Sequence, residues 1–226
     1  VLATLDTKGI EAAFVKQHIE ALGGEALLID MGLVGEPGTS PDVDRGTLIA
    51  TGGSSLEALL ENPDRQEAAP ILIAGATTIL RDLIAEGRIG AVLGFGGTQG
   101  SSNCSAVMQA LPYGFPKILL STMASGDTSS FVGIKDITMM FPVSDILGLN
   151  PLARTILANA AACAWGMAQA AVPLERTENG RAVIAMTNLG VLTDGTMHAL
   201  KRFEDAGHEV IVFHAVGSGG LAMEQL

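Results

Sequence analysis

Short apolar runs alternate with longer amphipathic segments along this chain. The runs predict strands at Val1–Leu5, Ala26–Asp30, Ile89–Phe95, Lys117–Thr122 and Ile137–Phe141. Apolar residues at helical spacing predict helices over Gly9–Leu22, Asp42–Thr51, Leu56–Glu61, Arg65–Glu86, Thr98–Leu111 and Asn150–Ala171. Inside the fourth of these helices, Ile71–Ile73 also fits a short strand. Strands that alternate with helices predict an α/β fold, a Rossmann-like parallel sheet with right-handed crossovers.

The pattern is interrupted at Val172–Arg181 and then starts again. That segment carries a proline, several charges and the turn signal Asn179-Gly180, which are typical of a linker. Beyond it the pattern predicts one βαβ unit and a further helix, at Ala182–Met186, Thr193–Ala206, Glu209–Phe213 and from Leu221 onward. One βαβ unit cannot bury both faces of its sheet. We therefore expect residues 1–175 to form a first Rossmann-like domain and residues 181–226 to be the N-terminal part of a second.

Composition narrows the class of protein. Hydrophobic residues make up 48% of the chain and charged residues only 16%, as expected when central strands are buried on both faces. Glycine and alanine interrupt the apolar stretches, which argues against a membrane span. A net charge of −11 argues against nucleic acid as the main partner. Two cysteines and no recognisable signal peptide indicate a cytoplasmic protein without a disulfide framework or zinc site.

The candidate chemistry lies where predicted strands end, because ligands of parallel sheets bind beyond the carboxyl ends of the strands. Three segments there are small and polar, namely Asp6–Gly9, Gly96–Ser102 (within the glycine-rich run Gly94–Ser102) and Met123–Ser130. The second is glycine-rich and joins a strand to a helix. Its backbone can approach a ligand closely and direct N–H groups at a phosphate or carboxylate.

These segments supply the predicted ligand-binding residues, which are Asp6, Thr7, Lys8, Gly9, Gly96, Gly97, Thr98, Gln99, Gly100, Ser101, Ser102, Ser125, Gly126, Asp127 and Thr128. Lys8 could contact a phosphate as a point charge, and Asp127 or Asp6 could ligate Mg²⁺ beside phosphates. Simpler interpretations stay open. The glycines would then only permit tight packing, Asp6 would cap the first helix, and the third segment would be a solvated turn.

Two common nucleotide motifs are absent from the glycine-rich segment. The dinucleotide pattern requires glycine where Gln99 stands, and the P-loop pattern requires a lysine where Ser101 stands. Cys104 follows near a predicted helix N-terminus, which can activate a thiol, but no histidine is close in sequence and we expect a packing role. His214 ends a strand before a glycine run and could face a cleft between the domains.

At the same segments the chain resembles the UPF0261 family of Tm-1-like ATP-binding domain proteins. The motifs that carry the resemblance are Leu2–Gly9, Gly94–Ser102, Leu120–Asp127, Asp136–Met140, Asp145–Asn150 and Val212–Ala215 with the glycines that follow. The resemblance implies two Rossmann-like domains, ATP binding in the first domain with Mg²⁺, and a homodimer. It places the nucleotide contacts at Asp6–Gly9, Gly96–Ser102 and Ser125–Thr128.

The leading hypothesis is therefore binding of ATP or a similar phosphorylated small ligand at the strand ends of the first domain. One alternative is an enzyme that acts on a small carboxylate or sugar acid in the interdomain cleft, with Lys8, Asp127 or His214 as acid or base. Another is a non-catalytic dimeric interaction module. The sequence shows no complete catalytic triad or metal cluster, so catalysis is left open.

Overall fold

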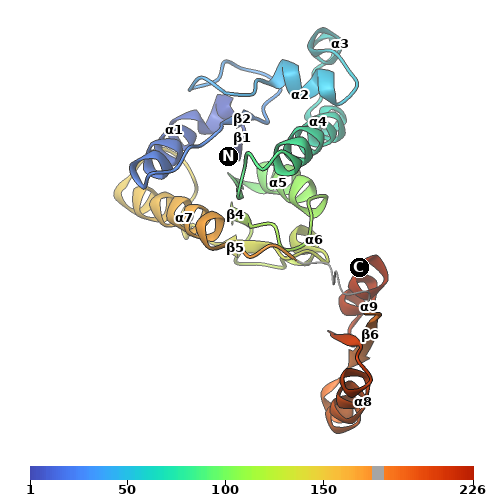
Figure 1. Ribbon diagram of the computed structural model, residues 1–226. Coiled ribbons are helices and arrows are strands. Elements are labelled where there is room, and N and C mark those ends of the chain that lie inside the picture. The colour runs from blue at the N-terminus through green and yellow to red at the C-terminus, as the bar shows by residue number, and fades with distance from the viewer. Residues whose placement is uncertain (175–180) are drawn as a thin grey trace. The chain divides into compact units, whose positions relative to one another are not determined.

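A computed structural model of the chain describes residues 1–174 and 181–226 (Figure 1). The chain divides into two compact units. The first consists of Val1–Val132 and Asp136–Val172, and the second is made chiefly of Pro173–Leu226. The turn expected at Asn179-Gly180 lies outside the described residues.

The first unit is built on a five-stranded parallel sheet in the order β2-β1-β3-β4-β5. The strands are β1 (Leu2–Ala3), β2 (Ile29–Asp30), β3 (Val92–Gly96), β4 (Lys117–Ser121) and β5 (Thr138–Met140). Every residue of β3 and β4 is buried, which explains their nearly continuous apolar sequence. The predicted α/β fold with a parallel sheet is confirmed.

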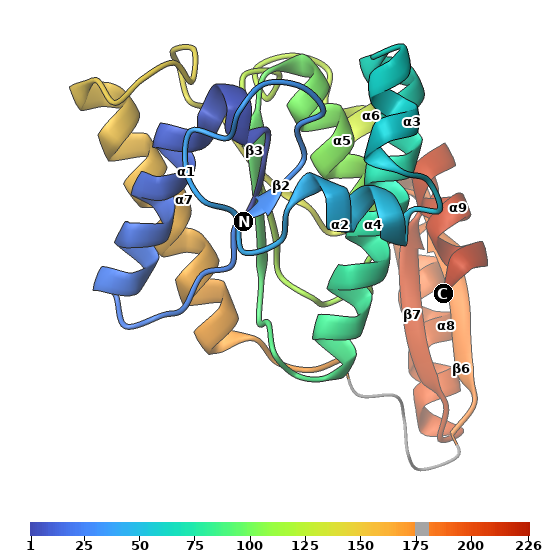
Figure 2. The same ribbon diagram turned by 90° about the horizontal axis from the view of Figure 1, so that it is seen from above.

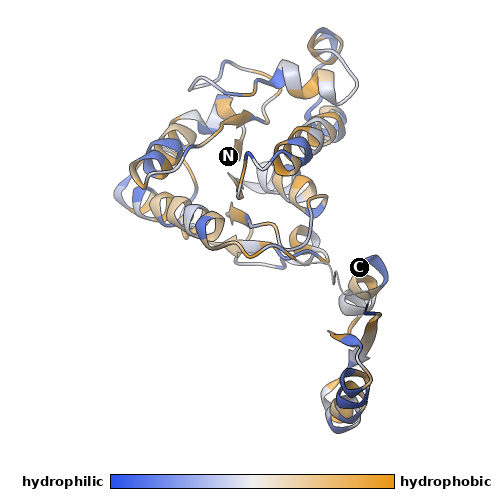
Figure 3. Cartoon of the chain, viewed as in Figure 1, coloured by the Kyte–Doolittle hydropathy of each residue, from blue (hydrophilic) through white to orange (hydrophobic). Residues whose placement is uncertain are grey.

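Helices cover both faces of this sheet. They are α1 (Leu5–Ala21), α2 (Arg45–Thr51), α3 (Leu56–Glu61), α4 (Arg65–Ala85), α5 (Thr98–Gln109), α6 (Ser129–Val132) and α7 (Pro151–Ala170). Figures 1 and 2 show α1 and α7 on one face and α2, α4 and α5 on the other. Side chains alternate between the two cores, so Leu93 packs toward α1 and α7 while neighbouring Val92 packs toward α4 and α5. The covering helices carry both hydrophilic and hydrophobic residues (Figure 3).

Helix α4 includes Ile71–Ile73, so the strand alternative for that segment is wrong. The helix packs closely on α2 through glycines. A Cβ added to Gly75 would clash with the carbonyl oxygen of Leu48, and one on Gly52 would clash with the carbonyl oxygen of Ile71. Among the described residues, α4 is the one helix long and apolar enough to span a membrane by length and composition. In the structure this helix packs against α2 and α5.

The start of the first helix differs from the prediction. The first strand stops at Ala3, and α1 begins at Leu5 rather than at Gly9. The reason is a cap from elsewhere in the sheet, because the carboxylate of Asp30 accepts a hydrogen bond from the backbone N–H of Leu5. The backbone at Lys8 departs from helical geometry, with φ −126° and ψ 18°. Asp6–Lys8 therefore lies on the first turn of a kinked helix and not in a loop.

Two other boundaries also shift. Helix α2 begins at Arg45 and not at Asp42, because Val43 still forms a parallel bridge with Ile29. The third polar segment was predicted as a loop up to Ser130, but its last residues begin the short helix α6 at Ser129.

The second unit contains a two-stranded parallel sheet with helices. Its elements are β6 (Val183–Asn188), the 3₁₀ helix η1 (Gly190–Leu192), α8 (Thr193–Asp205), β7 (Glu209–His214) and α9 (Gly217–Gln225). The last helix begins at Gly217 rather than at Leu221. Gly219 lies so close to the carbonyl oxygen of His214 that a Cβ there would clash, so the glycine run forms a tightly packed first turn.

Candidate functional site

A cavity of about 320 Å³ lies at the carboxyl edge of the first sheet. It is lined by Thr4, Asp6, Thr7, Lys8, Met31, Gly32, Leu33, Arg65, Leu72, Gly97, Thr98, Gln99, Gly100, Asn103 and Asp145. These residues come from segments that follow β1, β2, β3 and β5 and from helix α4. The cavity is therefore a composite site at the edge where ligands of parallel α/β sheets bind.

The N-terminus of α5 forms one wall of this cavity. Its N-cap is Gly97, and no side chain of the described residues caps the helix. Within the described part of the chain, no group accepts a hydrogen bond from the N–H of Thr98, Gln99 or Gly100. These donors and the positive end of the helix dipole are therefore available to an anion.

The glycines of this turn have different roles. A Cβ on Gly94 would lie 2.7 Å from Cβ of Cys104, and one on Gly96 would lie 3.0 Å from Cα of Gly100. Packing alone therefore explains those two glycines. Gly97 has an ordinary φ of −77°, and a Cβ added to it would meet no atom within 4 Å. Neither packing nor backbone conformation requires a glycine at 97, and its missing side chain keeps the cavity open.

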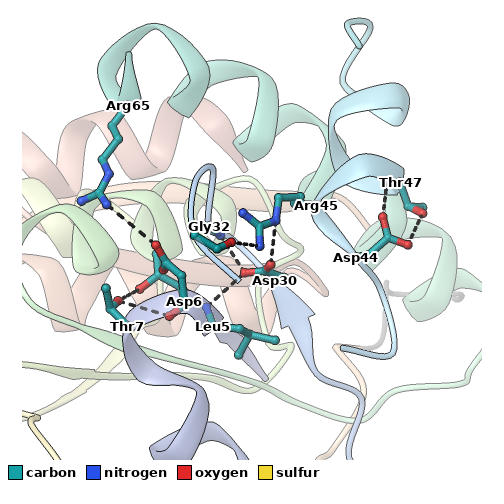
Figure 4. A network of polar contacts seen from close by, with 11 residues as sticks. Leu5, Asp6, Thr7, Asp30, Gly32, Asp44, Arg45, Thr47 and Arg65 are labelled. Atoms are coloured by element: carbon teal, nitrogen blue, oxygen red, sulfur yellow. Dashed lines mark hydrogen bonds and ion pairs between the residues drawn. The ribbon is translucent and has the colours of Figure 1, made fainter. Parts of the chain in front are cut away.

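A buried carboxylate holds the loop after β2, which also lines the cavity (Figure 4). Asp30, whose side chain is 1% exposed, accepts hydrogen bonds at Oδ1 from the N–H of Leu5 at 3.0 Å and of Gly32 at 2.9 Å. Nε of Arg45 lies 3.2 Å from the other oxygen, Oδ2. The same guanidinium donates to the carbonyl oxygen of Gly35. Asp30 and Arg45 thus fasten the loop after β2 to the start of α1.

Four charged side chains line the cavity. Oδ2 of Asp6 lies 3.8 Å from a guanidinium nitrogen of Arg65, whose side chain is 54% exposed (Figure 4). Lys8 provides a second cation and Asp145 a second carboxylate. The two side-chain cations balance the two carboxylates, and the open end of α5 adds partial positive charge.

The structure brings together about half of the predicted binding residues. Those lining the cavity are Asp6, Thr7, Lys8, Gly97, Thr98, Gln99 and Gly100. Gly9 does not line the cavity. A Cβ there would lie 2.7 Å from Cα of Gly38, so this glycine permits close packing of the two backbone segments. Gly96 lies beneath the turn and faces Gly100.

The two predicted serines on α5 bond within the protein. Ser101 is buried, and its Oγ donates to the carbonyl oxygen of Gly96 at 3.1 Å and lies 2.6 Å from Oγ of Ser121. Ser102 donates from Oγ to the carbonyl oxygen of Thr98. Neither lines the cavity, so their hydroxyls serve the strand-to-helix connection.

The third predicted segment, Ser125–Thr128, does not contribute to the lining of this cavity. Asp127 is exposed and accepts a hydrogen bond from the N–H of Ser129 at 2.9 Å. That bond lowers the pKa of the Asp127 carboxyl and caps the start of α6. His214 ends β7 in the second unit.

Cys104 is a packing residue, as expected. It is buried, and its Sγ lies 3.7 Å from the carbonyl oxygen of Leu2. Loss of solvation raises the pKa of its thiol to about 12. A thiol with that pKa is not a nucleophile near neutral pH.

Sequence reasoning missed Arg65, Asn103 and Asp145 as cavity residues. The strand-end rule could have found Asp145, since it lies in the segment after β5. Arg65 and Asn103 lie on helices, and only the tertiary fold brings them to this edge. Among the described residues, no group of three or more His, Cys, Asp or Glu side chains is arranged to hold a metal ion.

A larger cavity of about 440 Å³ lies toward the opposite end of the strands. Its lining is mainly apolar and includes Ile19, Leu80 and Trp165, with Glu25 and Arg88 as its charged residues. It has no open helix N-terminus among its lining residues, so the smaller cavity is the better candidate for an anionic ligand.

Comparison with known proteins agrees with the two-part organisation. Residues 1–173 match the family model "Uncharacterised protein family (UPF0261) N-terminal domain", and residues 181–226 match the corresponding C-terminal domain. The chain is 43% identical to a UPF0261 protein of Clostridium tetani and 38% identical to one of Rhizobium meliloti. Both alignments cover 100% of this chain and 55% of the relative, so the chain spans about half the length of these relatives.

A plant protein also matches. The chain is 36% identical over 168 residues to the ToMV susceptible protein tm-1(GCR26) of Solanum lycopersicum. That alignment covers 73% of this chain and 22% of the tomato protein. The two family models together span nearly the whole sequence, and the chain therefore belongs to the UPF0261 family.

Proposed function

We propose that the cavity at the carboxyl edge of the first sheet binds a phosphorylated small ligand, with ATP as the first candidate. The observation that carries the proposal is the open N-terminus of α5. Neither packing nor backbone geometry requires a glycine at position 97, and the absence of a side chain there leaves space in the cavity. The next three residues, whose N–H groups are available, line the same cavity. Such a helix terminus suits phosphate oxygens.

The charges of the cavity support the same ligand class. Arg65 and Lys8 lie where they can share the charge of a phosphate, Arg65 through two parallel N–H groups and Lys8 as a point charge. A bound phosphate would compete with Asp6 for the Arg65 guanidinium, which now lies 3.8 Å from that carboxylate. A volume of about 320 Å³ is at the lower end of the range for small-molecule pockets, roughly 300–1,000 Å³.

Mg²⁺ fits this site as a companion of the phosphates. In phosphate sites Mg²⁺ takes one or two protein carboxylates and completes its octahedron with phosphate oxygens and water. Asp6 and Asp145 are the carboxylates that line the cavity, so they are the proposed ligands in place of the exposed Asp127. Bound Mg²⁺ would neutralise phosphate charge beside both carboxylates.

The resemblance of the loops to Tm-1-like ATP-binding domain proteins agrees with this proposal. Catalysis by Lys8, Asp127 or His214 and a dimeric interaction role stay predictions, as do a homodimeric state and a cytoplasmic location. No contact among the described residues specifically supports any of these predictions. The cavity alone supports binding, and binding is the function we propose.

Calorimetric titration of the purified protein with ATP, with and without Mg²⁺, tests the proposal. We expect saturable binding that strengthens with Mg²⁺, together with a rise of the thermal midpoint as ligand binds the folded state. Adenosine serves as a control that lacks phosphate and should bind far more weakly. Absence of both heat and thermal shift at millimolar ATP and at millimolar inorganic triphosphate would refute the proposal.

A further inference from the structure

Asn103 is a buried polar residue on α5, and the described part of the chain offers it no hydrogen-bond partner. Only 6% of the residue is exposed, and its side chain lines the cavity. No described residue forms a hydrogen bond with its amide. The other buried polar side chains of α5 all have partners: Ser101 bonds to Gly96, Cys104 to Leu2 and Ser105 to Ser102.

The amide of Asn103 stays accessible from the cavity, because among the described residues only Asp30 and Thr77 have a side-chain polar atom that is fully enclosed without a hydrogen bond. Burial without a hydrogen bond disfavours a polar side chain, so partners are normally found in the protein or in a ligand. Asn103 is therefore better explained by a group that enters the cavity than by the packing of α5.

The backbone leaves a path from the helix end to Asn103. Residues three apart on a helix lie on one face, so Asn103 lies one turn beyond Gly100 along the cavity wall. A Cβ on Gly100 would meet only the carbonyl oxygen of Phe95, at an ordinary 3.6 Å. Packing does not require a glycine at position 100 either. Because Gly100 has no side chain, no side chain of that residue stands on the cavity wall between the N-terminus of α5 and Asn103.

The neighbouring charges indicate what Asn103 would bind. Asp6 and Asp145 line the same cavity, and ionised carboxylates only accept hydrogen bonds. Without a bridging Mg²⁺, a second anionic group would be repelled there. A hydroxyl group can donate to a carboxylate while it accepts from, or donates to, the Asn103 amide. The lining thus suits a ligand with phosphate at one end and hydroxyl groups beside it.

We propose that Asn103 recognises a sugar hydroxyl of the phosphorylated ligand, so that the site takes a sugar phosphate or the ribose phosphate part of a nucleotide. This inference rests on the proposed phosphate site at the N-terminus of α5. It adds a residue that selects among phosphate compounds. Inorganic phosphates would contact only the helix end and the cations.

The test compares Asn103→Leu with wild type by calorimetry, with ATP, ribose 5-phosphate and inorganic triphosphate as probes. Asn159→Leu is the matched control, because Asn159 is exposed on α7 and does not line the cavity. We expect Asn103→Leu to bind ATP and ribose 5-phosphate about tenfold more weakly, as for one lost hydrogen bond, and triphosphate unchanged. The thermal midpoint of unliganded Asn103→Leu should equal or exceed that of wild type.

Three results would overturn the inference. The first is unchanged affinity of Asn103→Leu for ATP and ribose 5-phosphate. The second is an equal loss for triphosphate, and the third is a lowered thermal midpoint without ligand, which would indicate a structural amide. Failure of wild type to bind any of the three probes would instead refute the phosphate site itself. The two failures are therefore distinguishable.

Discussion

The carboxylate of Asp30 at the end of β2 and the guanidinium of Arg45 at the start of α2 form a buried ion pair, with Nε 3.2 Å from Oδ2. The other carboxylate oxygen bonds to the N–H of Leu5 and of Gly32. One side chain thus joins β2, α1 and α2 at the edge of the sheet that carries the cavity.

Asp30→Ala is expected to destabilise the first unit by about 3–5 kcal/mol, because it leaves the largely buried Arg45 guanidinium without its carboxylate and the N–H of Leu5 without its acceptor. Urea unfolding followed by fluorescence of Trp165, the single tryptophan of the chain, reports on this unit. The control is Glu86→Ala, which breaks the exposed Arg88–Glu86 pair and should cost less than about 1 kcal/mol. Equal losses in the two variants would contradict the structural role of Asp30.

The fold was predictable because its signals are local. Buried strands such as β3 and β4 read as apolar runs, and the glycine-rich turn before α5 was recognisable from composition. The start of α1 was not predictable in this way. Its cap comes from Asp30, far along the chain from Leu5, so the local pattern placed the helix boundary too late.

The same limit applies to the site. Asp6 and Gly97 were predictable from the strand-end rule, because topology alone brings those segments to one edge. Arg65 and Asn103 reach the cavity through the packing of α4 and α5 on the sheet, which no short motif encodes. Conversely, Ser101 looks like a ligand residue in sequence but bonds to Ser121 in the fold.

Gly75→Ala is expected to destabilise the first unit by about 1–3 kcal/mol, since the added methyl group forces α4 away from the Leu48 carbonyl. Gly166→Ala is the matched control. It lies in α7 with no atom within 4 Å of an added Cβ, so it should stabilise by about 0.5–1 kcal/mol. Urea unfolding of both variants measures the difference. Similar effects of both substitutions would contradict the close approach of α2 and α4.

Cys104 is expected to resist alkylation in the folded protein, because burial raises the pKa of its thiol to about 12 and excludes the reagent. Cys163, which is half-buried on α7, should react first. In Cys163→Ala, Cys104 is the one cysteine left, and iodoacetamide should label it only after denaturant is added. Rapid labelling of native Cys163→Ala would show that the environment of Cys104 is more open than described.

Stability at acid pH should depend on Asp42. Burial would raise the pKa of this carboxyl, but hydrogen bonds from Nζ of Lys16 and the N–H of Leu28, both at 2.7 Å, lower it below its ordinary 3.8. A lowered folded-state pKa stabilises the protein above the unfolded value, and this contribution is lost as pH falls through the folded value. Asp42→Asn should therefore flatten the dependence of the unfolding free energy on pH below about 4. An unchanged slope would be evidence against these bonds.

Gly97→Leu is expected to weaken ATP binding at least about tenfold, because the new side chain would occupy the part of the cavity next to the N–H groups at the start of α5. The unfolding free energy should change by less than about 1 kcal/mol, since the site has ordinary φ and no atom within reach of a Cβ. Gly166→Leu controls for adding an exposed leucine and should bind ATP like wild type. Normal ATP affinity of a stable Gly97→Leu protein would mean that ATP does not occupy the end of α5, whereas joint loss of stability and binding would show that Gly97 is needed for packing.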